Sequence, residues 1–120
     1  MRRILIVEDD LNFLNFLKEK LSKRFITDIA EDGEIALKKI KENKPDLLIL
    51  DIILPKLDGF SILKWIRENY KDILVILATG KDKLEDIKEG YKLEADYYIT
   101  KPYKLEEIEK AIELLFILKK

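Results

Sequence analysis

Hydrophobic residues in this chain follow two alternating patterns, short unbroken runs and longer stretches with helical spacing. The short runs predict strands, because a wholly apolar run suits a strand that is buried on both faces. They occupy residues 3–7, 25–30, 47–50, 73–78 and 97–100. The amphipathic stretches predict helices, at residues 11–23, 34–43, 60–69, 83–93 and 104–118. Five β–α units in series indicate an α/β fold, with a five-stranded parallel sheet and helices on both of its faces.

Composition and net charge limit the kinds of protein that this chain can be. The chain has 120 residues, 48% of them hydrophobic and 39% charged, and no Pro- or Gly-rich linker divides it, so we expect one globular domain over residues 1–120. Its net charge of −1 gives no electrostatic case for nucleic acid or an anionic membrane as a direct partner. The apolar runs are too short to cross a bilayer, which favours a cytoplasmic location. Without cysteine or histidine, disulfides, zinc sites and Ser–His or Cys–His catalysis are excluded.

Polar residues stand at the carboxyl ends of four predicted strands. They are Glu8, Asp9 and Asp10 after the first strand, Asp51 after the third, Thr79 after the fourth and Lys101 after the fifth. In such sheets these ends meet in one crevice, where ligands bind. Carboxylates that come close together repel each other, and a hard divalent cation such as Mg²⁺ usually compensates. The sequence therefore predicts a partial magnesium site.

Each of these residues also has a simpler interpretation. Asp9 or Asp10 is a suitable N-cap for the first helix. Thr79 with Gly80 fits a plain turn, and Lys101 with Pro102 fits a plain loop. The joint occurrence of all these groups at the strand ends of one sheet favours the functional interpretation.

Four motifs resemble those of response-regulator receiver domains, which are CheY-like. They are LIVEDD at residues 5–10, LLILDIILPKLDG at residues 47–59, VILATG at residues 75–80 and DYYITKPY at residues 96–103. The resemblance extends along the whole chain. It implies a doubly wound, flavodoxin-like sheet with strand order 2-1-3-4-5.

The resemblance also implies a function in two-component signal transduction. Asp51 would accept a phosphoryl group from a sensor histidine kinase, with Mg²⁺ held by Glu8, Asp9, Asp51 and the backbone carbonyl of Ile53. Lys101 would pair with the phosphoryl oxygens, and Thr79 and Tyr98 would form the switch. The fourth helix, fifth strand and fifth helix would then contact an effector protein, an output domain or a second copy of the chain. Such a protein is not an enzyme beyond its own phosphorylation and dephosphorylation.

Two alternatives and several departures accompany this interpretation. The chain could be the receiver excised from a longer DNA-binding transcription factor. An aspartyl-phosphate phosphatase is disfavoured, because Ile53 stands where that class has a second aspartate. Glu94 replaces a frequent glycine, Gly80 replaces a commoner alanine, and Ile53 and Lys81 lie at positions that tune the phosphoryl lifetime in the family.

The last helix has more apolar residues than one buried face requires. Leu105, Ile108, Ile112 and Leu115 form its predicted core stripe. Leu114 and Ile117 point away from that stripe and are expected at the surface. They are scattered surface residues, or part of a self-association or effector surface on the side of the fourth helix and fifth strand, or a docking site for a removed downstream segment.

Overall fold

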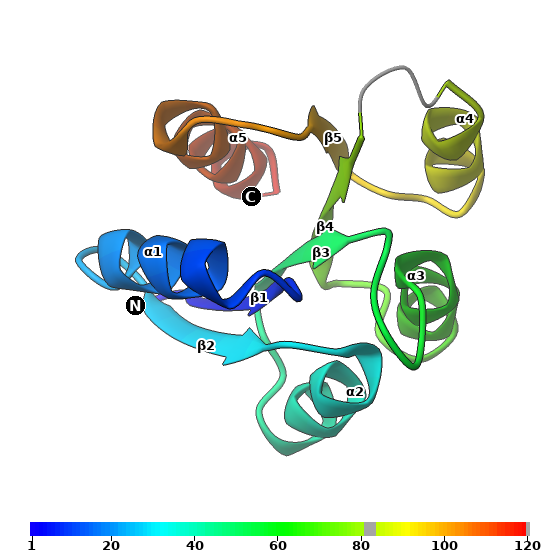
Figure 1. Ribbon diagram of the computed structural model, residues 1–120, viewed down its shortest axis with the longest axis horizontal. Helices are drawn as coiled ribbons and strands as arrows, with labels where there is room; N and C mark the ends of the chain where they lie inside the picture. Colours follow the sequence, from blue (N-terminus) through cyan, green and yellow to red (C-terminus); the bar gives the residue numbers. More distant parts are fainter. Residues whose placement is uncertain (81–83, 120) are drawn as a thin grey trace.

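A computed structural model describes residues 1–80 and 84–119 and has the predicted α/β architecture (Figure 1). The strands are β1 (Arg3–Val7), β2 (Ile26–Ala30), β3 (Leu47–Asp51), β4 (Leu74–Thr79) and β5 (Tyr97–Thr100). The helices are α1 (Leu11–Leu21), α2 (Gly33–Glu42), α3 (Gly59–Asn69), α4 (Leu84–Lys92) and α5 (Leu105–Leu118). All strand pairs are parallel, in the order β2-β1-β3-β4-β5. The expected topology is therefore confirmed.

Most boundaries agree with the predicted ones within two residues, and two differences concern functional side chains. Asp51 and Thr79 are the last residues of β3 and β4, where the sequence pattern placed them just beyond the strands. Asp51 pairs with Ala78 in the parallel ladder, so the backbone of both strands fixes its position. The predicted start of the fourth helix at residue 83 and the departure at Lys81 lie outside the described residues.

Two hydrophobic layers enclose the sheet. In Figure 1, α1 and α5 lie on one face, while α2, α3 and α4 lie on the other. Successive side chains of a strand point to opposite faces of the sheet and so contribute to both layers. In β1, Ile4 and Ile6 belong to the first core cluster, and Leu5 and Val7 belong to the second. Every residue of the central strand β3 is buried. This explains why its sequence is an unbroken apolar run up to Asp51.

The predicted buried and exposed faces of helix α5 are mostly confirmed. Its core stripe is buried except for Leu105, which is half-buried. Leu114 and Ile117 are 46% and 62% exposed, as expected. Ile117, however, borders a hollow with Arg24 and Phe25 at the α1–β2 connection. The alternative that placed Ile117 in a contact surface on the side of α4 and β5 is therefore not supported, because helical phase gives the exposed face but not the neighbouring element. Among the described residues, no helix combines the length and hydropathy needed to cross a bilayer.

Candidate functional site

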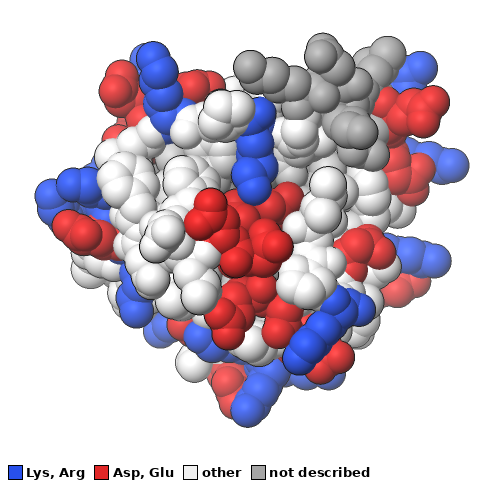
Figure 2. Space-filling model, in the orientation of Figure 1, with Lys and Arg blue, Asp and Glu red and all other residues white. Residues whose placement is uncertain are grey.

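Three carboxylates converge at the carboxyl ends of β1 and β3. Ligand oxygens of Glu8, Asp9 and Asp51 all lie within 4.8 Å of one another. The register explains this convergence, since Val7 pairs with Leu50 and the next residue of each strand is acidic. Glu8 and Asp51 are buried, with 3% and 5% of their surface exposed, whereas Asp9 is exposed. Figure 2 shows acidic side chains gathered at the centre of this face.

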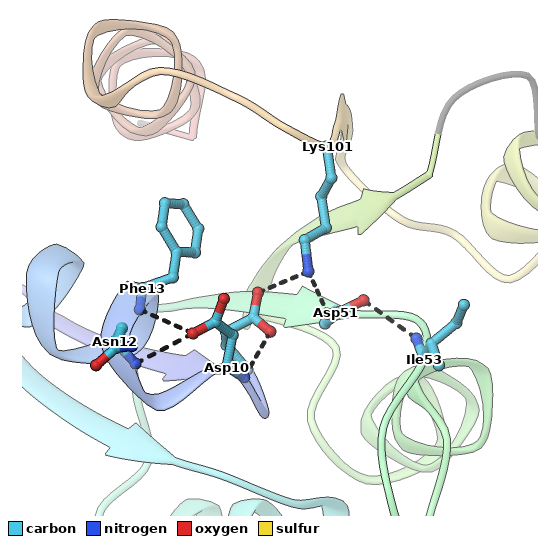
Figure 3. A network of polar contacts seen from close by, with 7 residues as sticks. Asp10, Asn12, Phe13, Asp51, Ile53 and Lys101 are labelled. Atoms are coloured by element: carbon cyan, nitrogen blue, oxygen red, sulfur yellow. Dashed lines mark hydrogen bonds and ion pairs between the residues drawn. The ribbon is translucent and has the colours of Figure 1, made fainter.

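Lys101 neutralises part of this charge. Its Nζ donates to Glu8 Oε1 at 2.8 Å and to Asp51 Oδ2 at 2.7 Å (Figure 3). Burial alone would lower the pKa of Lys101, but the hydrogen bonds to Asp51 and Glu8 and their negative charges outweigh it and raise the pKa above its usual value. The three carboxylates and one ammonium leave an excess of two negative charges. A divalent cation would match that excess.

Asp9 and Asp10 have different surroundings, which resolves the open N-cap assignment. Asp10 is the N-cap of α1, and its Oδ1 accepts from the backbone N–H groups of Asn12 and Phe13 at 3.1 and 3.2 Å (Figure 3). Glu8 Oε2 accepts from the backbone N–H of Asp10 at 3.1 Å. Within residues 1–80 and 84–119, the Asp9 carboxylate has no hydrogen bond or ion pair. It is therefore available to a cation.

Backbone contacts fix the loop that follows Asp51. Asp51 Oδ1 accepts from the backbone N–H of Ile53 at 3.1 Å, and the N–H of Gly59 donates to the carbonyl of Ile52 at 2.8 Å. A Cβ at Gly59 would lie 2.7 Å from Ile52 Cα and still closer to the Asp51 carbonyl oxygen. Real Cβ atoms do not approach other atoms so closely, so only glycine fits there. The glycine eight residues after Asp51 therefore has a steric cause.

The predicted switch residues lie on β4 and β5. Thr79 is 2% exposed, and its hydroxyl is the one buried side-chain polar atom in the described part of the chain that has no hydrogen-bond partner. Burying an unpaired hydroxyl is unfavourable, so its position requires an explanation. Tyr98 is half-buried, packs against the second core cluster and lies 5.3 Å from the ring of Tyr91.

Two residues near these elements were not singled out by sequence reasoning. Tyr103 is buried and packs edge-on against Phe13 at 5.1 Å. Burial, followed by the charges of Glu8 and Asp51, raises the pKa of Tyr103 well above its usual value. Arg67 of α3 reaches the α4–β5 connection. Tyr103 belongs to the DYYITKPY motif, which was a usable signal, whereas nothing in the local pattern around Arg67 indicates its contacts.

A match to a family model identifies the family to which this chain belongs. The model for the response regulator receiver domain matches residues 4–113. The chain belongs to the receiver-domain family. A receiver domain is the phosphoacceptor of a two-component system and not a classical enzyme, and it implies a cognate histidine kinase as partner. The acidic triad of Glu8, Asp9 and Asp51 is consistent with a receiver Mg²⁺ site.

Two curated relatives of this receiver domain are named transcriptional regulatory proteins. It is 41% identical over 114 residues to the transcriptional regulatory protein RprY of Bacteroides fragilis, covering 94% of this chain and 48% of the relative. It is 36% identical over 115 residues to the alkaline phosphatase synthesis transcriptional regulatory protein PhoP of Bacillus subtilis, covering 95% of this chain and 48% of the relative. The chain thus spans about half the length of these relatives.

A solved structure gives the same fold. The CheY-like receiver domain protein of Methanospirillum hungatei superimposes with a TM-score of 0.94 at 28% identity, covering 99% of this chain and 96% of that one. The flavodoxin-like arrangement of the receiver is therefore shared by both.

Glu94, the principal departure of this receiver from the family pattern, has the backbone conformation that favours glycine. Its φ is 67°, in the left-handed region. Arg67 stabilises this turn, since its Nε donates to the Glu94 carbonyl at 2.9 Å and its Nη2 to Asp96 Oδ2 at 2.7 Å. A third bond from Arg67 Nη1 reaches the carbonyl of Ile73 at 2.7 Å. The turn is therefore held by contacts from α3 in spite of the missing glycine.

Proposed function

We propose that Asp51 accepts a phosphoryl group from the histidine of a sensor kinase in a Mg²⁺-dependent reaction. The observation that carries this proposal is the placement of the buried Asp51 carboxylate, with Glu8 and Asp9 within 4.8 Å and the Lys101 ammonium at 2.7 Å. The chain has no histidine, so the donor must supply one. We also propose that residues 1–120 form one receiver domain.

The chemistry requires positioning and charge neutralisation more than proton transfer. An Asp51 carboxylate oxygen forms a bond to phosphorus while the bond from phosphorus to the donor's histidine nitrogen breaks. Lys101 is already within hydrogen-bonding distance of Asp51 and would follow the charge onto the phosphoryl oxygens. The product is an acyl phosphate on Asp51.

The donor set fits magnesium. Glu8, Asp9 and Asp51 offer the hard oxygen ligands that Mg²⁺ prefers, and the Ile53 carbonyl would add another. When bound, the cation would supply charge neutralisation for the transferring group. Asp9 would bind it directly, because its carboxylate has no competing partner in the described ranges. Glu8 would act through water, because its two oxygens already accept from Lys101 and from the Asp10 N–H.

Thr79 and Tyr98 would transmit the modification. The Thr79 hydroxyl gains a partner by moving to the new phosphoryl oxygens, which relieves its unpaired burial. Tyr98 then changes its packing and alters the face formed by α4, β5 and α5. That face would contact an effector protein, an output domain or a second copy of the chain.

A second context is favoured by the length of the relatives. RprY and PhoP are named transcriptional regulatory proteins, and the chain covers 48% of each. We propose that this receiver acts within a longer regulator of that kind, whose DNA-binding part is separate from residues 1–120. Sequencing the complete reading frame tests this directly.

Phosphorylation in solution tests the main proposal. Incubation with acetyl phosphate and Mg²⁺ should add the mass of one phosphoryl group, which is lost in base. The Asp51→Asn variant should show no addition, because the amide is not a nucleophile. The Asp58→Asn variant is the matched control, since Asp58 caps α3 in the same loop, and it should be labelled normally. Full labelling of Asp51→Asn would refute the assignment.

A further inference from the structure

Gly90 is buried inside α4, directly under the end of the Tyr98 ring. A Cβ built on Gly90 would lie 2.5 Å from Tyr98 Cε2, and closer still to Tyr98 Cζ and Oη. Any residue other than glycine would therefore place its first side-chain atom where the tyrosine ring lies. Tyr98 also contacts the ring of Tyr91, the next residue of the helix. The glycine thus creates the seat of the Tyr98 ring on α4.

A Cβ atom at Gly90 would meet a different kind of atom from a Cβ atom at Gly33 or Gly59. At Gly59 the nearest atoms are backbone atoms of Asp51 and Ile52, and at Gly33 the nearest is the carbonyl oxygen of Leu57. At Gly90 all three nearest atoms belong to the far end of one side chain. A tyrosine ring can rotate away about χ1, whereas a backbone cannot. A methyl group at residue 90 should therefore displace the ring and leave the fold intact.

Glycine in the interior of a helix is otherwise unfavourable. It lowers the folding equilibrium constant about fivefold relative to alanine, which is about 1 kcal/mol. In α4 this unfavourable glycine stands at the position where the ring of Tyr98 leaves no room for a Cβ atom.

We propose that Gly90 is a positioning residue for Tyr98, which seats the ring against α4 and thereby biases the switch toward the arrangement in which the ring is seated. The seat itself follows from the steric contact alone. The bias rests on the function proposed above, in which Tyr98 changes its packing when Asp51 is phosphorylated. Because a ligand shifts a two-state equilibrium only by its differential affinity, loss of the seat should change the affinity for a phosphoryl mimic.

A double-mutant cycle tests the seat without any ligand. In a Tyr98→Leu background the clash is absent, so Gly90→Ala should raise the folding equilibrium constant by about fivefold in urea unfolding. In the native background that gain should be missing, because the methyl group displaces the ring. An equal gain in both backgrounds would overturn the seat.

Fluorotyrosine NMR tests whether the ring moves. The Tyr98 signal, assigned by its loss in Tyr98→Phe, should shift in Gly90→Ala, while that of Tyr103 stays in place. Lys88→Ala, an exposed change on the same helix, is the control and should move neither signal. An unchanged Tyr98 signal in Gly90→Ala would also overturn the seat.

Beryllofluoride with Mg²⁺ tests the bias. The affinity of Gly90→Ala for this phosphoryl mimic should differ roughly fivefold from that of the native chain, while Lys88→Ala binds it equally. Tighter binding would assign the seated ring to the unphosphorylated state, and weaker binding would assign it to the phosphorylated state. Equal affinity in Gly90→Ala would overturn the bias even if the ring had moved. If the native chain did not bind the mimic at all, the proposed function would fail. The double-mutant cycle would still test whether Gly90 seats the Tyr98 ring.

Discussion

The loop that begins at Asp51 and the region of the predicted switch are built differently. On the fixed side, defined as residues 51–59 with Gly33, backbone packs against backbone: the Gly59 N–H donates to the Ile52 carbonyl, and Gly33 leaves room for the carbonyl of Leu57. On the movable side, defined as Thr79, Gly90 and Tyr98, the decisive contacts are made by side chains. The Thr79 hydroxyl has no hydrogen-bond partner within the described residues, and the ring of Tyr98 lies over Gly90.

This difference corresponds to the two tasks of a receiver. Holding a cation requires ligands at constant positions, and on the fixed side the Ile53 N–H holds the Asp51 carboxylate in place. Signalling requires an element with two arrangements of similar free energy, and rotatable side chains supply one. The predictions below test whether the two sides are independent.

The largest effect is expected at the fixed side. Gly59→Ala should lower the free energy of unfolding by about 3 kcal/mol, because the added methyl group meets backbone atoms that have no rotamer to adopt. Urea unfolding measures the change. Lys64→Ala, an exposed substitution on the same helix, should stay within about 0.5 kcal/mol. A Gly59→Ala variant as stable as the native chain would show that this side is not fixed.

Arg67 should stabilise the α4–β5 connection, which joins the two elements that carry Gly90 and Tyr98. Arg67→Met removes two hydrogen bonds to the α4–β5 connection and one to the carbonyl of Ile73, just before β4, so it should lower the free energy of unfolding by about 2 kcal/mol. The control is Lys44→Met, whose partner Asp72 is exposed and whose loss should change stability by less than about 1 kcal/mol. Equal effects of both substitutions, measured by urea unfolding, would remove Arg67 from this role.

Asp9 should affect the cation site without affecting the movable side. Asp9→Asn should weaken Mg²⁺ binding roughly tenfold, which is about 1.4 kcal/mol. It should also relieve repulsion with Glu8 and Asp51 and so stabilise the metal-free fold. Titration followed by NMR gives the affinity, with Asp10→Asn as a control that keeps the N-cap. Unchanged Mg²⁺ affinity in Asp9→Asn would exclude Asp9 as a ligand.

The smallest effect is expected at Glu94. Its left-handed φ of 67° is unfavourable for a residue with a Cβ, so Glu94→Gly should raise the free energy of unfolding by up to about 1 kcal/mol. Thermal unfolding measures the gain. Glu68→Gly, an exposed change inside α3, should instead lower stability by about 1 kcal/mol. A loss of stability in both variants would mean that the Glu94 side chain itself contributes to the turn.

The sequence predicted the sheet and the acidic site because both depend on local patterns. Unbroken apolar runs give the buried strands, and parallel strands bring their carboxyl ends together, so Glu8 and Asp51 had to be neighbours. Local patterns did not distinguish Asp9 from Asp10 as the N-cap, because both residue types cap equally well and only the backbone path selects Asp10.

Contacts between distant elements were not predictable in the same way. Gly90 lies under Tyr98, and Arg67 reaches Glu94, through the particular packing of α3, α4 and β5. Periodicity gave the exposed position of Ile117 but not its neighbours Arg24 and Phe25, since periodicity describes one helix and not the elements around it.

Nuclear Overhauser contacts before and after addition of beryllofluoride and Mg²⁺ test the separation of the two sides most directly. In the unmodified chain, the ring protons of Tyr98 should contact the α-protons of Gly90, and the α-protons of Gly33 should contact Leu57. Addition of the mimic should change the intensity of the first contact and leave the second unaltered. An unchanged Tyr98–Gly90 contact, or loss of the Gly33–Leu57 contact, would contradict a movable switch beside a fixed cation site.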